Sequence, residues 1–119
     1  MLQHVSLEID PGLVRDAVAF WELLGFTEVD SPEPLAGYVT WLEREGTQIH
    51  LIHTDAAAVP LLGHAAVVVE DFDAVVAALG EAGHEVLPTR ELWGAARSFA
   101  IGPGGHRVEL MAAPPPTSR

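Results

Sequence analysis

Hydrophobic and polar residues follow two periods along the chain. Short alternating or continuous apolar runs are typical of strands, and apolar residues three or four positions apart indicate an amphipathic helix. The first helix is predicted from Asp10-Pro11, an N-cap residue followed by proline, to Gly25. A second helix is predicted from Phe72 to Gly83. Strands are predicted over residues 2–9, 26–30, 37–43, 47–53, 63–70, 84–87, 97–101 and 106–111.

The order strand, helix and three strands occurs twice, which indicates an internal repeat. His4 and His64 are 60 positions apart, and each lies early in the first strand of its half. Gly25 and Gly83 are 58 positions apart, and each ends a helix. We therefore predict an α+β fold of two tandem βαβββ modules in a single domain, residues 1–59 and 60–112, followed by a disordered tail, residues 113–119.

Composition limits the classes of protein that this chain can represent. It has 119 residues, of which 49% are hydrophobic, enough for a folded core. It contains no Cys, which excludes disulfides and thiolate chemistry. We find neither a run long enough to cross a membrane nor a secretory signal, so we expect a cytoplasmic protein.

The charge balance is strongly acidic. The chain has seventeen Asp and Glu residues, six Arg and no Lys, which gives a net charge of −11. Binding to nucleic acids or anionic membranes depends on basic patches, so both are excluded as partners. Residues 1–59 carry −8 and residues 60–119 carry −3. Such a field attracts cations, including metal ions, although solubility alone is an equal explanation.

Four polar residues interrupt apolar strands at positions that the repeat makes equivalent: His4 with His64, and His50 with Glu109. Successive side chains of a strand point to opposite faces, so positions 50 and 109 point away from their apolar neighbours. If the two modules pack about a pseudo-twofold axis, the four side chains converge. Three imidazoles and one carboxylate suit a divalent transition metal.

Each of these residues also has a purely structural interpretation. A single histidine in a strand is more often a hydrogen-bonded, half-buried side chain than a ligand. For Glu109 the alternative is an exposed sheet face or an ion pair with Arg97 or Arg107. His53 has the opposite parity to His50, so we expect it on the other face, at the surface. Tyr38 and Trp41 are candidates for the wall of a cleft.

Four segments carry a resemblance to a known family: residues 4–7, 20–26, 63–64 and 102–110, the last being Gly-Pro-Gly-Gly-His-Arg-Val-Glu-Leu. In these segments the chain resembles the vicinal oxygen chelate superfamily. This superfamily includes glyoxalase I, fosfomycin-resistance proteins, methylmalonyl-CoA epimerase, extradiol dioxygenases and bleomycin-resistance proteins. The resemblance covers residues 2–112, and the last segment is the most specific.

The resemblance implies a cupped eight-stranded sheet with helices on its outer face and a metal held by the first and fourth strands of both modules. It places ligands at His4, His64 and Glu109. His50 stands where glyoxalase I has Glu and the epimerase has Gln, so it keeps the capacity to bind metal. The metal would be Zn, Ni, Co, Mn or Fe. The resemblance also implies substrate contacts near Trp93 and Arg97, and a homodimer.

The activity expected from this resemblance is that of a metal-dependent lyase or isomerase acting on a small oxygenated molecule. His50 and Glu109 are the two candidates for its base. An Fe(II) extradiol dioxygenase, with His4, His64 and Glu109 as ligands, is a second enzyme class. The alternative outside enzymes is a bleomycin-resistance-like protein that sequesters an antibiotic without a metal. Phosphonate and CoA substrates are less favoured, because the chain has no Lys.

Overall fold

The structure is a computed structural model that describes residues 1–117. The chain forms two compact units, Met1–Leu61 and Leu62–Arg119, and the boundary falls two residues after the one predicted from the repeat. The prediction of an α+β fold built from two tandem βαβββ modules is confirmed. The prediction that the two modules make one domain stays a prediction.

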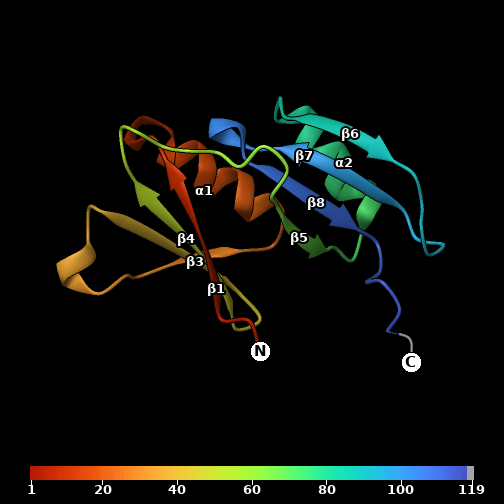
Figure 1. Cartoon of the computed structure of the whole chain (residues 1–119), viewed down its shortest axis with the longest axis horizontal. Helices are drawn as coiled ribbons and strands as arrows, with labels where there is room; N and C mark the ends of the chain where they lie inside the picture. Colours follow the sequence, from red (N-terminus) through yellow and green to blue (C-terminus); the bar gives the residue numbers. More distant parts are fainter. Residues whose placement is uncertain (118–119) are drawn as a thin grey trace. The chain divides into compact units, whose positions relative to one another are not determined.

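The first unit contains one four-stranded sheet and one helix (Figure 1). Its sheet has the order β1-β4-β3-β2, in which β1 and β4 are parallel and the other pairs are antiparallel. Its elements are β1 (His4–Ile9), α1 (Val14–Leu23) preceded by a 3₁₀ turn (Pro11–Leu13), β2 (Thr27–Val29), a second 3₁₀ turn (Glu33–Leu35), β3 (Val39–Arg44) and β4 (Thr47–His53).

The second unit repeats this topology with a sheet of order β5-β8-β7-β6, in which β5 and β8 are the parallel pair. Its elements are β5 (Ala65–Val68), α2 (Phe72–Glu81), β6 (Glu85–Thr89), β7 (Arg97–Ile101), a 3₁₀ turn (Pro103–Gly105) and β8 (Arg107–Met111). The eight predicted strands are therefore present, hydrogen-bonded as two sheets of four.

Both helices end as the sequence predicts, but α1 begins at Val14, later than predicted, after a 3₁₀ turn that Asp10 caps. The Asp10 carboxylate accepts a hydrogen bond from the backbone N–H of Gly12 at 2.8 Å, and Asp71 caps α2 in the same way through Ala74 at 3.4 Å. Gly25 and Gly83 end the two helices with the same φ, +91°. This left-handed conformation is open to glycine without steric cost, and it turns the chain toward the next strand.

The core of each unit lies on one face of its sheet. Ile49 and Leu51 of β4 are buried, as are Val108 and Leu110 of β8. Helix α1 packs against β2 and β3, and α2 packs against β6. Because strand residues alternate between faces, this burial leaves the side chains at positions 50 and 109 on the opposite face of their sheets.

Residues at the C-terminal end have no regular secondary structure over 113–117. The carbonyl of Ala113 nevertheless accepts a hydrogen bond from the indole N–H of Trp93 at 2.9 Å. Residues 118–119 of the predicted tail lie outside the described part of the chain. No helix within residues 1–117 is long and apolar enough to span a membrane.

Two alanine substitutions in the second helical segment should change stability in opposite directions. Gly83→Ala forces a Cβ into the left-handed region and should lower the free energy of unfolding by about 1–2 kcal/mol. Gly80→Ala lies inside α2 with open space around the new Cβ, and should raise it by about 0.5–1 kcal/mol. Urea unfolding followed by circular dichroism measures both; equal effects would contradict this account of the helix end.

Candidate metal and ligand site

The parallel pairing of first and last strands brings the predicted residues together two by two. His50 lies beside Ser6 in the β1–β4 pair, and Glu109 lies beside Ala66 in the β5–β8 pair. Within the first unit His4 contacts His50, and within the second His64 contacts Glu109. In each contact the earlier residue is exposed and the later one is buried. The equivalence predicted from the repeat is therefore present in the structure.

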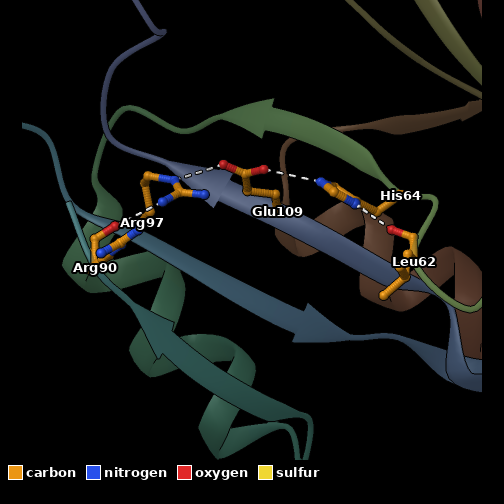
Figure 2. A network of polar contacts seen from close by, with 5 residues as sticks. All are labelled: Leu62, His64, Arg90, Arg97 and Glu109. Atoms are coloured by element: carbon orange, nitrogen blue, oxygen red, sulfur yellow. Dashed lines mark hydrogen bonds and ion pairs between the residues drawn. The ribbon is translucent and has the colours of Figure 1, made fainter. Parts of the chain in front are cut away.

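His64 and Glu109 form a pair whose outer atoms are already hydrogen-bonded (Figure 2). The two residues face each other through His64 Nε2 and Glu109 Oε1, which are 3.1 Å apart. On the outer side, His64 Nδ1 donates to the carbonyl of Leu62 at 2.9 Å. Glu109 Oε2 accepts from Arg97 Nε at 2.9 Å. The two inner atoms of the pair therefore face each other directly.

Arg97 is fixed on three sides and is the ion-pair partner of Glu109. Its Nη1 donates to the carbonyl of Arg90 at 2.8 Å, and its guanidinium lies 5.1 Å from the centre of the Trp93 ring. The side chains of Arg97 and Glu109 are each only 10% exposed. Of the two partners proposed from the sequence, Arg97 pairs with the carboxylate, whereas Arg107 lies over the ring of Phe99.

The ionisation of Glu109 reflects two opposed effects. Burial disfavours the carboxylate and raises its pKa, but hydrogen bonds and charge from Arg97 and His64 outweigh burial and leave the pKa below its usual value. Glu109 is therefore ionised at neutral pH. A lowered pKa means that the ionised group stabilises the fold above pH of about 4.5, and this contribution is lost as pH falls further.

The equivalent pair in the first unit is held by ring stacking. The His50 ring lies 4.0 Å from the ring of His4 at 15° and 4.3 Å from the ring of Trp41 at 4°, measured between centroids. Burial, and to a smaller extent the proximity of His4, lowers the pKa of His50. His50 is therefore a neutral imidazole at physiological pH.

A hydrogen-bond chain that sequence reasoning missed runs into His50. Its Nε2 lies 2.7 Å from Gln48 Oε1, and Gln48 Nε2 donates to Glu43 at 3.0 Å. The available signal was the position of Gln48 two residues before His50, which puts both on one face of β4. Its partner Glu43 lies on β3, and the pairing of these strands is a property of the fold.

The remaining predicted residues lie in different settings. His53 is on the other face, as expected: its Nδ1 donates to the carbonyl of Gly37 at 3.1 Å, and its Nε2 lies 2.8 Å from the Thr40 hydroxyl. Tyr38 is 69% exposed, just before β3. Trp41 has a buried indole N–H without a hydrogen-bond partner among the described residues.

The separation of the two donor atoms in the second unit is compatible with a shared divalent metal ion. Two donors on one ion, each at about 2.1 Å, are roughly 3.0–3.4 Å apart, and the separation of His64 Nε2 and Glu109 Oε1 falls in this range. In the first unit the stacked rings of His4 and His50 do not aim at one point, so the exposed His4 has to turn before both hold an ion. No three ligating side chains gather in one place within residues 1–117.

The chain is similar to a known protein family and to several solved structures. The model of the Glyoxalase/Bleomycin resistance protein/Dioxygenase superfamily matches residues 7–110. Among solved structures, a Bacillus anthracis protein assigned to the glyoxalase family is 26% identical, with a TM-score of 0.83 and 93% of each chain covered. No match is found among curated proteins.

Two further structures share the fold at lower identity. The fosfomycin resistance protein FosX of Listeria monocytogenes is 18% identical, with a TM-score of 0.77 and coverage of 96% of this chain and 91% of its own. TnmS3, an antibiotic binding protein from Streptomyces sp. CB03234, is 21% identical, with a TM-score of 0.73 and coverage of 92% and 93%. At these identities the likeness concerns the fold alone.

Removing Arg97 should be costly because it leaves Glu109 buried without its guanidinium. We expect Arg97→Gln to lower the free energy of unfolding at pH 7 by about 3 kcal/mol. The deficit should shrink as pH falls below about 4, since a protonated carboxyl no longer depends on the cation. The double variant Arg97→Met/Glu109→Met should recover most of the loss. Denaturant titrations at several pH values measure this; a deficit independent of pH would contradict the assigned ion pair.

Proposed function

Because the chain belongs to the Glyoxalase/Bleomycin resistance protein/Dioxygenase superfamily, we propose that it is a metal-dependent enzyme of the lyase or isomerase type. Its substrate would be a small molecule that offers two neighbouring oxygen atoms to a divalent metal ion. The proposed ligands of that ion are His4, His50, His64 and Glu109.

The His64–Glu109 pair is the observation that carries this proposal. Metal-ligating histidines usually donate their second N–H to a carbonyl or carboxylate, and ligating carboxylates are themselves hydrogen-bonded. Leu62 and Arg97 supply these two outer contacts. The inner atoms, Nε2 of His64 and Oε1 of Glu109, are joined by a hydrogen bond in the metal-free chain, and a bound cation would replace the hydrogen between them.

The bound metal would supply Lewis-acid chemistry, polarising the substrate oxygens and stabilising the negative charge that develops on them. The protein's own contribution is to hold its groups in fixed states. Arg97 keeps Glu109 ionised and restrains one of its oxygens. The rings of Trp41 and His4 cover both faces of His50 and exclude water from them.

Proton transfer requires a base, and His50 and Glu109 are the two candidates. Glu109 is the weaker base, because Arg97 and His64 hold its pKa below the usual value. Burial lowers the pKa of His50, so its ring is neutral at physiological pH and a ring nitrogen can accept a proton. We therefore assign the proton-accepting role to His50, which would act as a base only when it is detached from the metal.

The side chains proposed to contact substrate are Tyr38, Trp41, Trp93 and Arg97. Arg97 already uses Nε and Nη1 in hydrogen bonds within the protein, so its Nη2 is the group left for a substrate. Trp93 already uses its indole N–H, so it can offer a substrate only a face of its ring. Trp41 retains an indole N–H without a partner among the described residues. Tyr38 is accessible to solvent.

Two other functions remain alternatives. Antibiotic sequestration is favoured by the charge of −8 in residues 1–59 together with the ring stack, because cations bind to aromatic faces. An Fe(II) dioxygenase would use His4, His64 and Glu109 and leave His50 beside a position that oxygen chemistry keeps open. The metal content of the purified protein distinguishes these functions, because antibiotic sequestration needs no metal whereas the lyase or isomerase and the dioxygenase both need one.

The proposed ligands should contribute unequally to metal affinity. Glu109→Gln and His64→Ala should each weaken binding by more than about 100-fold, since each removes a strong donor, with His4→Ala close behind. His50→Gln should cost about 10-fold, because an amide oxygen still binds metal. His53→Ala is the matched control on the opposite face and should have no effect. Competition with a chromophoric chelator measures each affinity.

This ranking has two outcomes that would contradict it. If His53→Ala weakens binding as much as His50→Gln, the face assigned to the ligands is wrong. If Glu109→Gln leaves affinity unchanged, the metal site does not exist as proposed, and sequestration becomes the better explanation.

We also propose that the protein acts as a homodimer. Each four-stranded sheet has edge strands, β1 and β2 in the first unit and β5 and β6 in the second, and such edges can pair with another chain. Light scattering at micromolar concentration should give twice the chain mass of 12.7 kDa. A mass equal to one chain would contradict the dimer.

A further inference from the structure

The imidazole of His50 lies between two other rings, so only its edge can be approached. Trp41 covers one face and His4 the other, both nearly parallel to it. The N–H and the nitrogen lone pair of an imidazole lie in the plane of the ring. Since the two stacked rings block both faces, His50 can bind a ligand or a proton only through a ring nitrogen. Which nitrogen carries the proton therefore decides which one is free to bind.

The orientation of the Gln48 amide follows from Glu43. An ionised carboxylate only accepts hydrogen bonds, so the atom of Gln48 that lies 3.0 Å from Glu43 is the amide nitrogen. The amide oxygen then faces Nε2 of His50 at 2.7 Å. An amide oxygen also only accepts, so Nε2 of His50 must carry a proton.

The other nitrogen of His50 is left open. Nδ1 has no hydrogen-bond partner among the described residues. Of their unpartnered side-chain nitrogen and oxygen atoms, only the Trp41 indole nitrogen is fully buried, so Nδ1 of His50 is accessible. In the neutral ring the proton on Nε2 leaves the lone pair on Nδ1. Both ring nitrogens of His64, by contrast, have hydrogen-bond partners: Nδ1 donates to Leu62 and Nε2 is bonded to Glu109.

We infer that Gln48 is a positioning residue for His50: held by Glu43, its amide keeps the imidazole proton on Nε2 and presents Nδ1 to a metal ion or a substrate proton. What Nδ1 binds rests on the proposed function. The position of the proton does not, because it is a property of the metal-free chain. The residues His50, Gln48 and Glu43 thus form one functional chain across β3 and β4.

Nitrogen NMR of the metal-free protein labelled with ¹⁵N-histidine tests the position of the proton directly. At a pH of about 8 the His50 ring is neutral, because its pKa is lowered, and two-bond ¹H–¹⁵N spectra distinguish a protonated from an unprotonated ring nitrogen. We expect His50 to be protonated on Nε2 alone. Protonation on Nδ1 in the wild-type protein would overturn the inference.

Three variants show whether Gln48 is the cause. Gln48→Lys still pairs with Glu43 but presents a donor to His50, so the proton should move to Nδ1. Gln48→Leu removes the acceptor, so both tautomers should become populated. Gln3→Leu, which removes the partner of His4 Nδ1, should leave His50 unchanged. If His50 keeps the same single tautomer in both Gln48 variants, Gln48 has no positioning role.

Loading with ¹¹³Cd²⁺ tests what Nδ1 does. We expect ¹¹³Cd–¹⁵N coupling at Nδ1 of His50 and at Nε2 of His64, and an affinity about 10-fold lower for Gln48→Lys. Coupling at Nε2 of His50 would overturn the inference. If no Cd²⁺ binds while the tautomers behave as predicted, the role of Gln48 is supported and the proposed metal function fails.

Discussion

The parallel pairing of the first and fourth strands of each module is the constraint on which the candidate site depends. It places β1 against β4 and β5 against β8, so side chains distant in sequence become neighbours on one face. The opposite face of the same strands is apolar and buried. A shift of one residue in either register would exchange the two faces and bury the polar groups in the core. The packing of the core therefore also fixes the orientation of the site.

The two units support equivalent positions by different physical means. In the second unit the carboxylate of Glu109 is buried, and a guanidinium and an imidazole compensate its charge. In the first unit His50 occupies the equivalent place as a neutral ring, held by stacking and by an amide. A buried carboxylate is stable only with a cationic partner, whereas a neutral imidazole requires only hydrogen bonds and contact. Arg97 accordingly has no basic equivalent in the first unit, where Val39 takes its position.

The sequence predicted the fold further than it predicted the site. Both helices, all eight strands and the repeat could be read from periodicity and glycine placement, because these are local signals. The repeat predicted which polar positions are equivalent, whereas the contact of His64 with Glu109 depends on the pairing of β5 with β8. The choice of Arg97 over Arg107 could not be predicted, since it depends on which side chain reaches across from β7. The stack on His50 and its link to Glu43 were missed for the same reason: they are contacts between strands.

The central proposal is that Glu109, together with His64, holds a divalent metal ion. The most direct test is the metal content of protein purified without a histidine tag, measured by elemental analysis after exposure to Zn, Ni, Co, Mn or Fe(II) and removal of unbound ions. The account predicts one ion per chain for at least one of these metals, and loss of that ion in Glu109→Gln. Protein that retains none of them, while remaining folded, would contradict it.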